Sequence, residues 1–535
     1  MYVNAFHCVA LSPRIPFPFS AGSYGNRQCA HATNQGLDLK KRDDITLERS
    51  AGPEETPVAA SHRRMLPGHH WLQTPRIAGQ GLSRRSFIGG LSAAVAGVIG
   101  AGAYPAFGAA SGTPSRPLLF TNLRLFDGAS RKVREGVNVL VEQNRIAALP
   151  AVGQSVDNAS LVDCGGRLLM PGLIDAHWHS MFCGITEARA MRSTVGYLYL
   201  VAAQEAERTL MRGFTSVRDV GGPSFDLKRA IDEGIATGPR IYPSGAMISQ
   251  TSGHGDFRLR SDVPRSNASA LSYAEQIGAA AIADGSSEVL RRVREQLMLG
   301  ASQIKLMAGG GVSSPYDPLD TTQYSEEELR AAVGAAEDWG TYVMVHVYTP
   351  RGIQRAVRAG AKSIEHGQLA DEESARMMAG EGVWWSLQPF LADDDANFKV
   401  DPAARAKQLQ VAEGTKRAYR LARDLGIKTA WGTDILFTPN NLPSHGRQLA
   451  KLIEFYPSLE LLQIATARNG ELLGLCGERN PYGAQVGVIQ PGALADLLVV
   501  DGDPTQNLDF LGEPEKNLQL IMKDGQIYKN QLPVS

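Results

Sequence analysis

The chain has 535 residues, of which 43% are hydrophobic and 20% charged, a composition typical of a soluble globular protein with a large core. Its 54 lysines and arginines balance 55 aspartates and glutamates. The chain therefore lacks the basic excess that would indicate nucleic acid as a partner. Five cysteines are too few, too scattered and odd in number for a disulfide framework.

The first 110 residues are expected to lie outside the folded part. Residues 1–82 lack periodic apolar structure, which predicts a disordered or non-native extension, and translation would then begin at Met65. Ser83-Arg-Arg-Ser-Phe87 precedes a weakly apolar stretch rich in Gly and Ala, so residues 83–110 resemble a bacterial twin-arginine signal peptide. We therefore expect the twin-arginine export machinery as a partner and a periplasmic or secreted location. The alternative, a membrane anchor, is disfavoured because a segment so rich in Gly and Ala makes a poor and unstable span.

Short alternating strands are predicted near both ends of the remaining chain. They are Leu118–Asn122, Val137–Val141, Arg145–Leu149, Ala495–Asp501 and Leu518–Tyr528. Neither group alone has enough strands to bury a face. We therefore expect residues 111–166 and 475–535 to form one composite β-sandwich.

Strand-like runs alternate with helices in the central region, residues 167–474. Ser325 and Glu328 form a capping box that begins one helix. Pro350 to Ala359 is predicted as the next helix, which Gly360 ends. Repeated strand–helix units of this size favour an α/β fold with a TIM-type (β/α)8 barrel, although a doubly wound open sheet fits the pattern as well.

Six polar side chains stand where these predicted strands end. They are His177, His179, Lys305, His346, His366 and Asp434. Because side chains alternate along a strand, His177 and His179 point to the same face and can bind one ion. Ligands from many strand ends converge only if the sheet closes, which favours the barrel over the open sheet. The pattern indicates a metal-dependent hydrolase.

Lys305 is unusual because Ile304 and Leu306 flank it on an apparently buried strand, whereas lysine is seldom fully buried. One interpretation is a buried ion pair. The other is a neutral amine, favoured by desolvation, that reacts with CO2 to form a carbamate. The two carbamate oxygens would then bridge two ions.

These segments together resemble the amidohydrolase superfamily, in particular its imidazolonepropionase-like branch, which includes prolidase-type Xaa-Pro dipeptidases. The resemblance extends from about Leu118 to Tyr528. It rests on the motifs Met170-Pro-Gly-Leu-Ile-Asp-Ala-His-Trp-His179, Ile304-Lys-Leu-Met-Ala-Gly-Gly-Gly311, Glu365-His-Gly367 and Gly432-Thr-Asp434.

The resemblance implies two divalent metal ions, usually zinc, and zinc suits this mixture of imidazole and carboxylate ligands. By that resemblance, His177, His179 and Asp434 hold one ion, and His346 and His366 hold the other. The carbamylated lysine and a hydroxide would bridge the two. Asp434 would also take the proton of the attacking hydroxide and return it to the leaving amine, with a role as ligand alone as the alternative.

Three further residues are candidate substrate contacts. Tyr348, two residues past His346, points toward the ions if the strand continues, and otherwise packs at the barrel rim. Arg218 would hold a substrate carboxylate through two hydrogen bonds, or form a structural ion pair with Asp219 or another acid. His254, in a glycine-rich loop, resembles a family active-site histidine that donates to the substrate. Specificity is expected to lie in two loops, Ser252–Asn267 and Phe390–Val400.

The resemblance implies hydrolysis of an amide bond in a small molecule or dipeptide, with a C-terminal proline or a similar bulky residue. Another small amide, an N-acyl amino acid, a lactone or a cyclic amide is the alternative. Ring deaminases and imidazolonepropionases usually use one ion and place a glutamate shortly after the histidine, but His346-Val-Tyr-Thr-Pro350 has none. A non-catalytic relative would typically have lost ligands, and none is missing. The sequence leaves the oligomeric state open, a homo-oligomer included.

Overall fold

A computed structural model describes residues 116–266, 269–314 and 316–532 of the chain. The extension predicted over residues 1–82 and the export signal predicted over 83–110 lie outside these residues. Within the described ranges, each helix is too short or too polar to cross a lipid bilayer.

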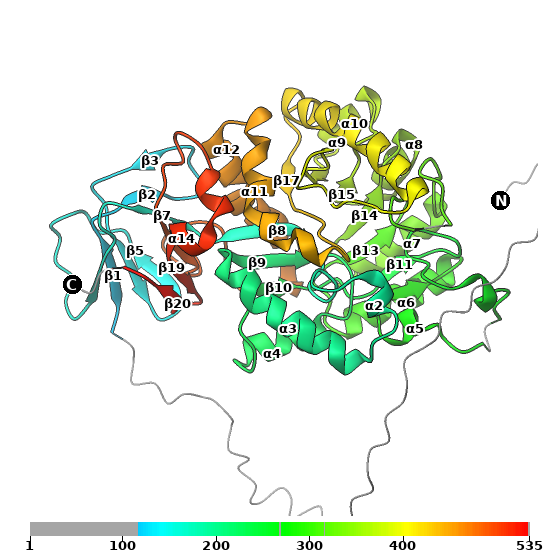
Figure 1. Ribbon diagram of the computed structural model, residues 1–535, viewed down its shortest axis with the longest axis horizontal. Coiled ribbons are helices and arrows are strands. Elements are labelled where there is room, and N and C mark those ends of the chain that lie inside the picture. Colours follow the sequence, from blue (N-terminus) through cyan, green and yellow to red (C-terminus); the bar gives the residue numbers. More distant parts are fainter. Residues whose placement is uncertain (1–115, 267–268, 315, 533–535) are drawn as a thin grey trace, which may run out of the picture. The chain divides into compact units, whose positions relative to one another are not determined.

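Parallel strands form the centre of the fold, as Figure 1 shows. One sheet has the order β10-β9-β8 and the other the order β12-β11-β13-β14-β15-β16-β17. Their bounds are β8 (Leu173–Trp178), β9 (Phe214–Asp219), β10 (Arg240–Tyr242), β11 (Met247–Ser249), β12 (Ala280–Ile282), β13 (Ile304–Met307), β14 (Val343–Val347), β15 (Ser363–His366), β16 (Trp384–Leu387) and β17 (Thr429–Trp431). The backbone N–H of Asp434, just after β17, donates to the carbonyl of His177 on β8 over 3.0 Å. The last strand thus meets the first, and the predicted TIM-type barrel is confirmed over the open sheet.

Most helices follow barrel strands and lie on the outside of the barrel, whereas α14 contacts β19 (Leu518–Lys523), a strand that lies beside the barrel (Figure 1). They are α2 (Glu187–Ala190), α3 (Val195–Met211), α4 (Phe225–Asp232), α5 (Tyr273–Gln276), α6 (Ser286–Met298), α7 (Glu326–Glu337), α8 (Pro350–Ala359), α9 (Glu372–Gly380), α10 (Pro402–Asp424), α11 (His445–Ala450), α12 (Ser458–Gln463), α13 (Asn469–Gly474) and α14 (Pro514–Asn517).

Local signals set the ends of two of these helices. The hydroxyl of Ser325 accepts from the backbone N–H of Glu328 ahead of α7, and the Glu328 carboxylate accepts from the backbone N–H of Ser325, so the predicted capping box is confirmed. Helix α8 begins at Pro350 and is followed by Gly360 at a φ of 101°, the left-handed conformation that glycine adopts without strain.

Strands from both ends of the described chain build a β-sandwich beside the barrel. One sheet has the order β5-β4-β1-β6 and the other the order β20-β19-β18-β7-β2-β3. Their bounds are β1 (Leu118–Thr121), β2 (Arg124–Phe126), β3 (Val133–Arg134), β4 (Val139–Glu142), β5 (Arg145–Ala148), β6 (Ser160–Asp163), β7 (Leu168–Pro171), β18 (Leu497–Val500), β19 (Leu518–Lys523) and β20 (Gln526–Asn530). Strand β18 pairs antiparallel with β7, which places Leu498 opposite Met170. The two ends of the described chain therefore share one sheet, as the sequence predicts.

The C-terminal strand prediction needs one change. Residues 518–528 were expected as one strand-like segment, but β19 and β20 form a hairpin with a turn at Asp524 and Gly525. Both turn residues have positive φ, 56° and 71°, the conformation that an Asp-Gly turn adopts between twisted strands.

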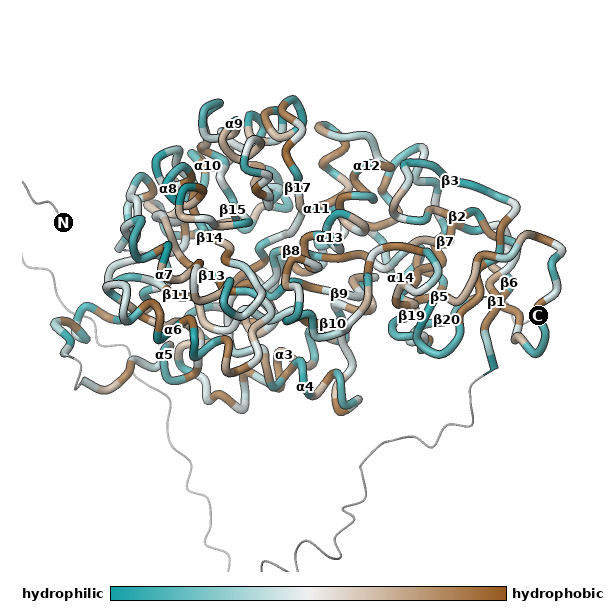
Figure 2. The backbone as a smooth tube through the Cα atoms, turned by 180° about the vertical axis from the view of Figure 1, so that it is seen from behind, coloured by the Kyte–Doolittle hydropathy of each residue, from teal (hydrophilic) through white to brown (hydrophobic). Residues whose placement is uncertain are grey.

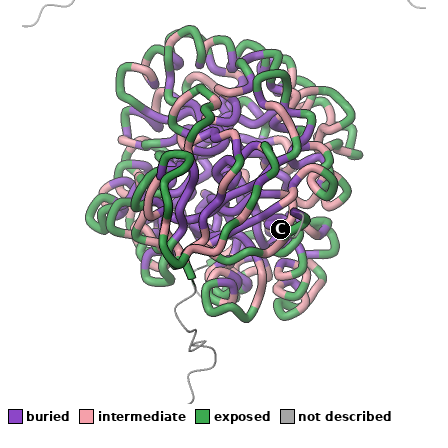
Figure 3. Tube along the Cα trace, turned by 90° about the vertical axis from the view of Figure 1, so that its left-hand side faces the viewer, coloured by how far each residue is buried: buried purple, intermediate pink, exposed green. Residues whose placement is uncertain are grey.

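Apolar residues fill the interior of both parts, and Figure 2 shows brown segments along the strands. Figure 3 shows buried strands surrounded by exposed outer segments. A buried ion pair joins the two parts: Arg240 on β10 donates to Asp496 before β18 over 3.0 Å and to Asp524 over 2.7 Å. This ion pair thus connects the barrel to the sandwich.

Candidate metal centre

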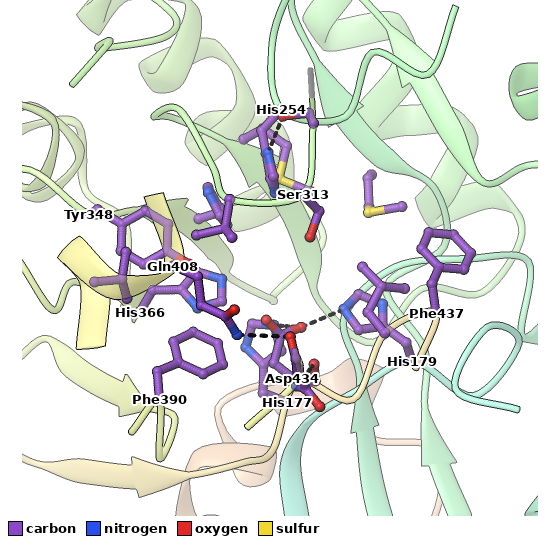
Figure 4. Close-up of a pocket in the computed structure, with 18 of the residues that line it drawn as sticks. His177, His179, His254, Ser313, Tyr348, His366, Phe390, Gln408, Asp434 and Phe437 are labelled. Atoms are coloured by element: carbon purple, nitrogen blue, oxygen red, sulfur yellow. Dashed lines mark hydrogen bonds and ion pairs between the residues drawn. The ribbon is translucent and has the colours of Figure 1, made fainter. Parts of the chain in front are cut away.

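A cavity opens among the carboxyl ends of the barrel strands, and all six predicted ligands line it, as do Tyr348 and His254. The space that the centres of water-sized molecules can occupy in it is about 60 Å³, which is room for several such molecules. Figure 4 shows Asp434 between His177 and His179, with His366, Tyr348 and Phe390 on another side.

His177, His179 and Asp434 meet at one point of the cavity. The Nε2 atoms of His177 and His179 lie 3.4 Å and 3.1 Å from Oδ1 of Asp434. One ligand atom each from His177, His366 and Asp434 lie within 4.8 Å of one another, a spacing that one ion could fill. Burial opposes the ionisation of Asp434, but the neighbouring His177 and His179 outweigh it and hold the pKa of this carboxyl well below its usual range.

His346 and His366 lie beside this group, with ring centroids 4.4 Å apart. Burial, reinforced by cationic neighbours, lowers the pKa of both rings well below the usual range, so they are held neutral, the form that binds metal. Nε2 of His346 donates to the Gly310 carbonyl over 3.2 Å, which leaves its Nδ1 as a free electron-pair donor. Within the described ranges, Nδ1 of His366 is buried and has no hydrogen-bond partner.

Lys305 completes the set from β13. Its side chain is 1% exposed, and no hydrogen bond or ion pair joins its amine to another described residue. Burial lowers the pKa of Lys305 to about 8, against the pull of Glu365 and Asp434. Within the described ranges, Lys305 therefore forms no buried ion pair, and the carbamate stays a prediction. Four imidazoles, a carboxylate and an unpaired amine are a donor set that fits a pair of divalent ions.

Arg218 does not line the cavity, and the expectation that it contacts a substrate carboxylate is corrected. The side chain is 0% exposed, and its Nη2 donates to both oxygens of Glu365 over 2.7 Å and 2.8 Å. The ion-pair alternative holds, although with Glu365 as the partner and not Asp219. Burial raises the pKa of Glu365, but Arg218 and His177 outweigh it and keep this carboxylate ionised.

Glu365 orients one of the predicted ligands, a role that sequence reasoning missed. Its Oε2 accepts from Nδ1 of His177 over 2.7 Å. This bond fixes the tautomer and leaves Nε2 facing Asp434 as the donor atom. Strand alternation would place Glu365 and the adjacent His366 on opposite faces, so this role could not be predicted from the sequence. His366 has a left-handed backbone that departs from the strand geometry, and both residues reach the site.

A second buried network joins the first and last strands of the barrel. Asp175 accepts from the backbone N–H of His177 over 2.9 Å and from the Thr433 hydroxyl over 2.7 Å. Nε2 of His445 lies 3.0 Å from the same carboxylate, and its ring stacks on Phe214 with centroids 3.5 Å apart. This contact could not be predicted from the sequence, because His445 is 270 residues away from Asp175 and follows no predicted strand.

Two of the predicted ligands have backbone conformations that residues with side chains rarely adopt. His366 has a φ of 73° and Asp434 a φ of 53°, both in the left-handed region. The His366 carbonyl is held by the indole N–H of Trp385 over 2.7 Å. Such strain persists only where the surroundings enforce it, and it is characteristic of functional sites.

Aromatic and imidazole rings form the wall on the substrate side. Tyr348 is buried beside His366 with ring centroids 5.1 Å apart, so it faces the predicted ligands, and it also packs against Leu319 and Val411. His254 stacks on His346 at 4.1 Å, and its Nδ1 lies 2.8 Å from the Ser314 hydroxyl. His254 and Phe390 come from the two loops expected to set specificity.

Comparisons with known proteins agree with this geometry. A sequence profile of the amidohydrolase family matches residues 168–528. The ochratoxinase of Aspergillus niger is 32% identical over 376 residues, which cover 68% of this chain and 76% of that protein. Two similar crystal structures are an amidohydrolase (36% identity, TM-score 0.71) and a prolidase in complex with N-methylphosphonate-L-proline (33% identity, TM-score 0.70). Each match covers 78% of this chain and 100% of the other.

Proposed function

This chain belongs to the amidohydrolase family and hydrolyses amide bonds, and from that premise we propose a binuclear metal-dependent dipeptidase of the Xaa-Pro type. The observation behind the proposal is the cavity in which four imidazoles, Asp434 and the unpaired amine of Lys305 line one wall. The likeness to a prolidase over 78% of this chain supports the substrate class.

In this proposal, His177, His179 and Asp434 would hold one divalent ion, and His346 and His366 would hold the second. Lys305, carbamylated by CO2, would add oxygen donors, and zinc suits the donors. When bound, two such ions would polarise the scissile carbonyl and lower the pKa of a water molecule in the site.

The remaining steps belong to side chains. Ionised Asp434 accepts a proton from the attacking water at a carboxylate oxygen and returns it to the leaving nitrogen. His254 and Tyr348 are the donors that would orient the substrate carbonyl or carboxylate. The rings of Tyr348 and Phe390 exclude water from one side of the site.

The second candidate is hydrolysis of another small amide, above all of an N-acyl amino acid. The relative that favours it is the Aspergillus niger ochratoxinase, which is 32% identical to this chain. Lactones and cyclic amides are further members of this alternative.

The test is a screen of Xaa-Pro dipeptides, other dipeptides and N-acyl amino acids against zinc-loaded protein and its Lys305→Ala variant. We expect Xaa-Pro hydrolysis by the parent protein and its near loss in the variant, with partial rescue by short-chain carboxylates that replace the carbamate. Undiminished turnover by Lys305→Ala would rule out the bridging role. Selective hydrolysis of N-acyl amino acids would favour the second candidate.

We propose further that the chain is exported through the twin-arginine machinery. Support comes from Ser83-Arg-Arg-Ser-Phe87 and the Gly/Ala-rich segment after it. Replacing Arg84 and Arg85 by Lys should retain the full-length precursor in the cytoplasm of a bacterial host, whereas export of the variant at the parent rate would contradict the proposal.

A further inference from the structure

Lys399 lines the cavity from the segment between β16 and α10. Within the described ranges, no hydrogen bond or ion pair within 4.0 Å joins its ammonium to another residue; its backbone N–H donates to Gln408 over 3.2 Å. Burial lowers the pKa of Lys399, against the attraction of Asp434 and Glu187. A partly desolvated ammonium without a partner is costly, and an anion that enters the cavity would remove that cost.

The backbone that carries Lys399 is fixed to the metal centre. The Asn397 amide donates to the Asp434 carbonyl over 3.1 Å, and its side-chain oxygen accepts from Asn441 over 2.6 Å. Gln408 on α10 in turn donates to the Asn397 carbonyl over 2.8 Å. These contacts hold the backbone next to Lys399 in place relative to Asp434. A binding site for one end of a substrate requires such a fixed position.

The other cations near the cavity are already engaged. The guanidinium of Arg218 is buried on Glu365, away from the cavity. Lys407 donates to the carbonyls of Gly311 (3.1 Å), Ser314 (3.1 Å) and Asp317 (2.8 Å). Lys305 lies among the metal ligands. Among the described residues of the cavity wall, Lys399 is therefore the cation that remains for a ligand.

Building on the proposed amide hydrolysis, we propose that Lys399 binds the free carboxylate of the leaving amino acid. The substrate class is then an amide whose nitrogen belongs to an amino acid with an unblocked carboxyl group, which dipeptides and N-acyl amino acids share. Glu187 also lines the cavity and attracts Lys399 from a distance. A bound carboxylate gives the ammonium a closer partner. Substrates whose carboxyl group is blocked as an amide lose this contact.

The first test compares each cleaved substrate with its C-terminal amide in the zinc-loaded parent protein, Lys399→Met and Lys399→Arg. For the free acid, Lys399→Met should lower kcat/KM about 100-fold, mainly through KM, because the carboxylate loses its charged partner. Lys399→Arg should keep most of the value. For the amide, Lys399→Met should change kcat/KM less than about twofold, because that substrate makes no such contact. An equal loss on acid and amide would overturn the proposal.

The control is Lys416→Met, because Lys416 lies on α10 outside the cavity and pairs with Glu454 at the surface. This variant should behave as the parent protein on both substrates.

The second test measures binding without turnover. Calorimetric titration of zinc-loaded protein with 3-phenylpropionate, a carboxylate with no amide bond, should give a Kd at least about 10-fold weaker in Lys399→Met than in the parent protein and in Lys416→Met. If the parent protein hydrolyses no amide but shows this difference, the proposed reaction fails and the carboxylate contact stands. Equal affinities in parent and Lys399→Met, or no binding by the parent protein, would overturn the contact itself.

Discussion

At the scale of single residues, two buried cations of the barrel show how surroundings decide chemistry. Arg218 has a carboxylate within 2.7 Å, so it keeps its charge and fixes Glu365 and, through it, His177. Lys305 has no such partner, so burial favours the neutral amine that can react with CO2. The sequence predicted that Lys305 is special. It could not show which alternative holds for Arg218, because Glu365 lies 147 residues away.

The lowered pKa of Lys305 predicts a pH dependence of stability in the metal-free chain. The folded state holds the amine neutral above about 8, whereas the unfolded chain keeps the proton up to 10.5. Between these values unfolding takes up a proton, so the free energy of unfolding should rise with pH, by on the order of 3 kcal/mol in total. Urea unfolding at a series of pH values, in the presence of a chelator, measures this rise in the free energy of unfolding.

The matched variant for this prediction is Lys305→Met, which removes the titrating amine. Lys305 also lowers the pKa of His346, His366 and Glu365, but these groups titrate well below pH 8 and leave this window unaffected. It should lack this component of the rise between pH 8 and 10.5. If parent and variant have parallel stability profiles, the amine of Lys305 is not held neutral by burial.

Arg218→Met tests the buried ion pair. Loss of one partner leaves Glu365 charged and unpaired in the interior, and we expect a cost of about 3–5 kcal/mol in the free energy of unfolding. Arg229→Met is the control, because Arg229 forms an ion pair with Glu233 at the surface and the side chain is 74% exposed. Its urea midpoint should match that of the parent protein. Equal urea midpoints for both variants would mean that the buried pair of Arg218 and Glu365 contributes nothing to the free energy of unfolding.

At the scale of secondary-structure elements, the sequence predicted what depends on neighbours in the chain. The capping box of α7 and the Pro and Gly at the ends of α8 are local signals, and the structure confirms them. The left-handed backbone at His366 and Asp434 was not predictable, because it goes with contacts to distant residues. Trp385 donates to the His366 carbonyl, and the backbone N–H of Asp434 donates to His177. The same holds for the contact of Asp175 with His445.

Helix α10 passes so close to the site that one of its glycines has no room for a side chain. A Cβ at Gly414 would lie 2.1 Å from the carbonyl oxygen of Gln368, two residues after His366. Gly414→Ala should therefore lower the free energy of unfolding by about 1–3 kcal/mol, although alanine favours helices. Thermal and urea unfolding measure the change.

Gly334→Ala on α7 is the matched control, because nothing lies within 4 Å of the Cβ that it adds. It should raise the free energy of unfolding by about 0.5–1 kcal/mol. A gain of stability in both variants would show that α10 can move away from the site without cost.

At the scale of the whole molecule, the closed barrel brings together residues that span 258 positions of the chain, from His177 to Asp434. Repeated strand–helix units and polar residues at strand ends were enough to predict this closure and the six side chains that line the cavity. The pairing of β18 with β7 was expected, because neither end of the chain has enough predicted strands to bury a face by itself. The position of Lys399 in the cavity wall was not expected, because Lys399 lies in a loop without periodic structure.

The most direct test of the two-metal site is the metal content of the purified chain, measured with its rate of amide hydrolysis. We predict close to two zinc ions per chain, loss of both ions and of hydrolysis on treatment with a chelator, and recovery when zinc and bicarbonate are added. Asp434→Ala should hold fewer ions and hydrolyse little. A chain that hydrolyses its substrate at an undiminished rate after its metal has been removed would contradict the account.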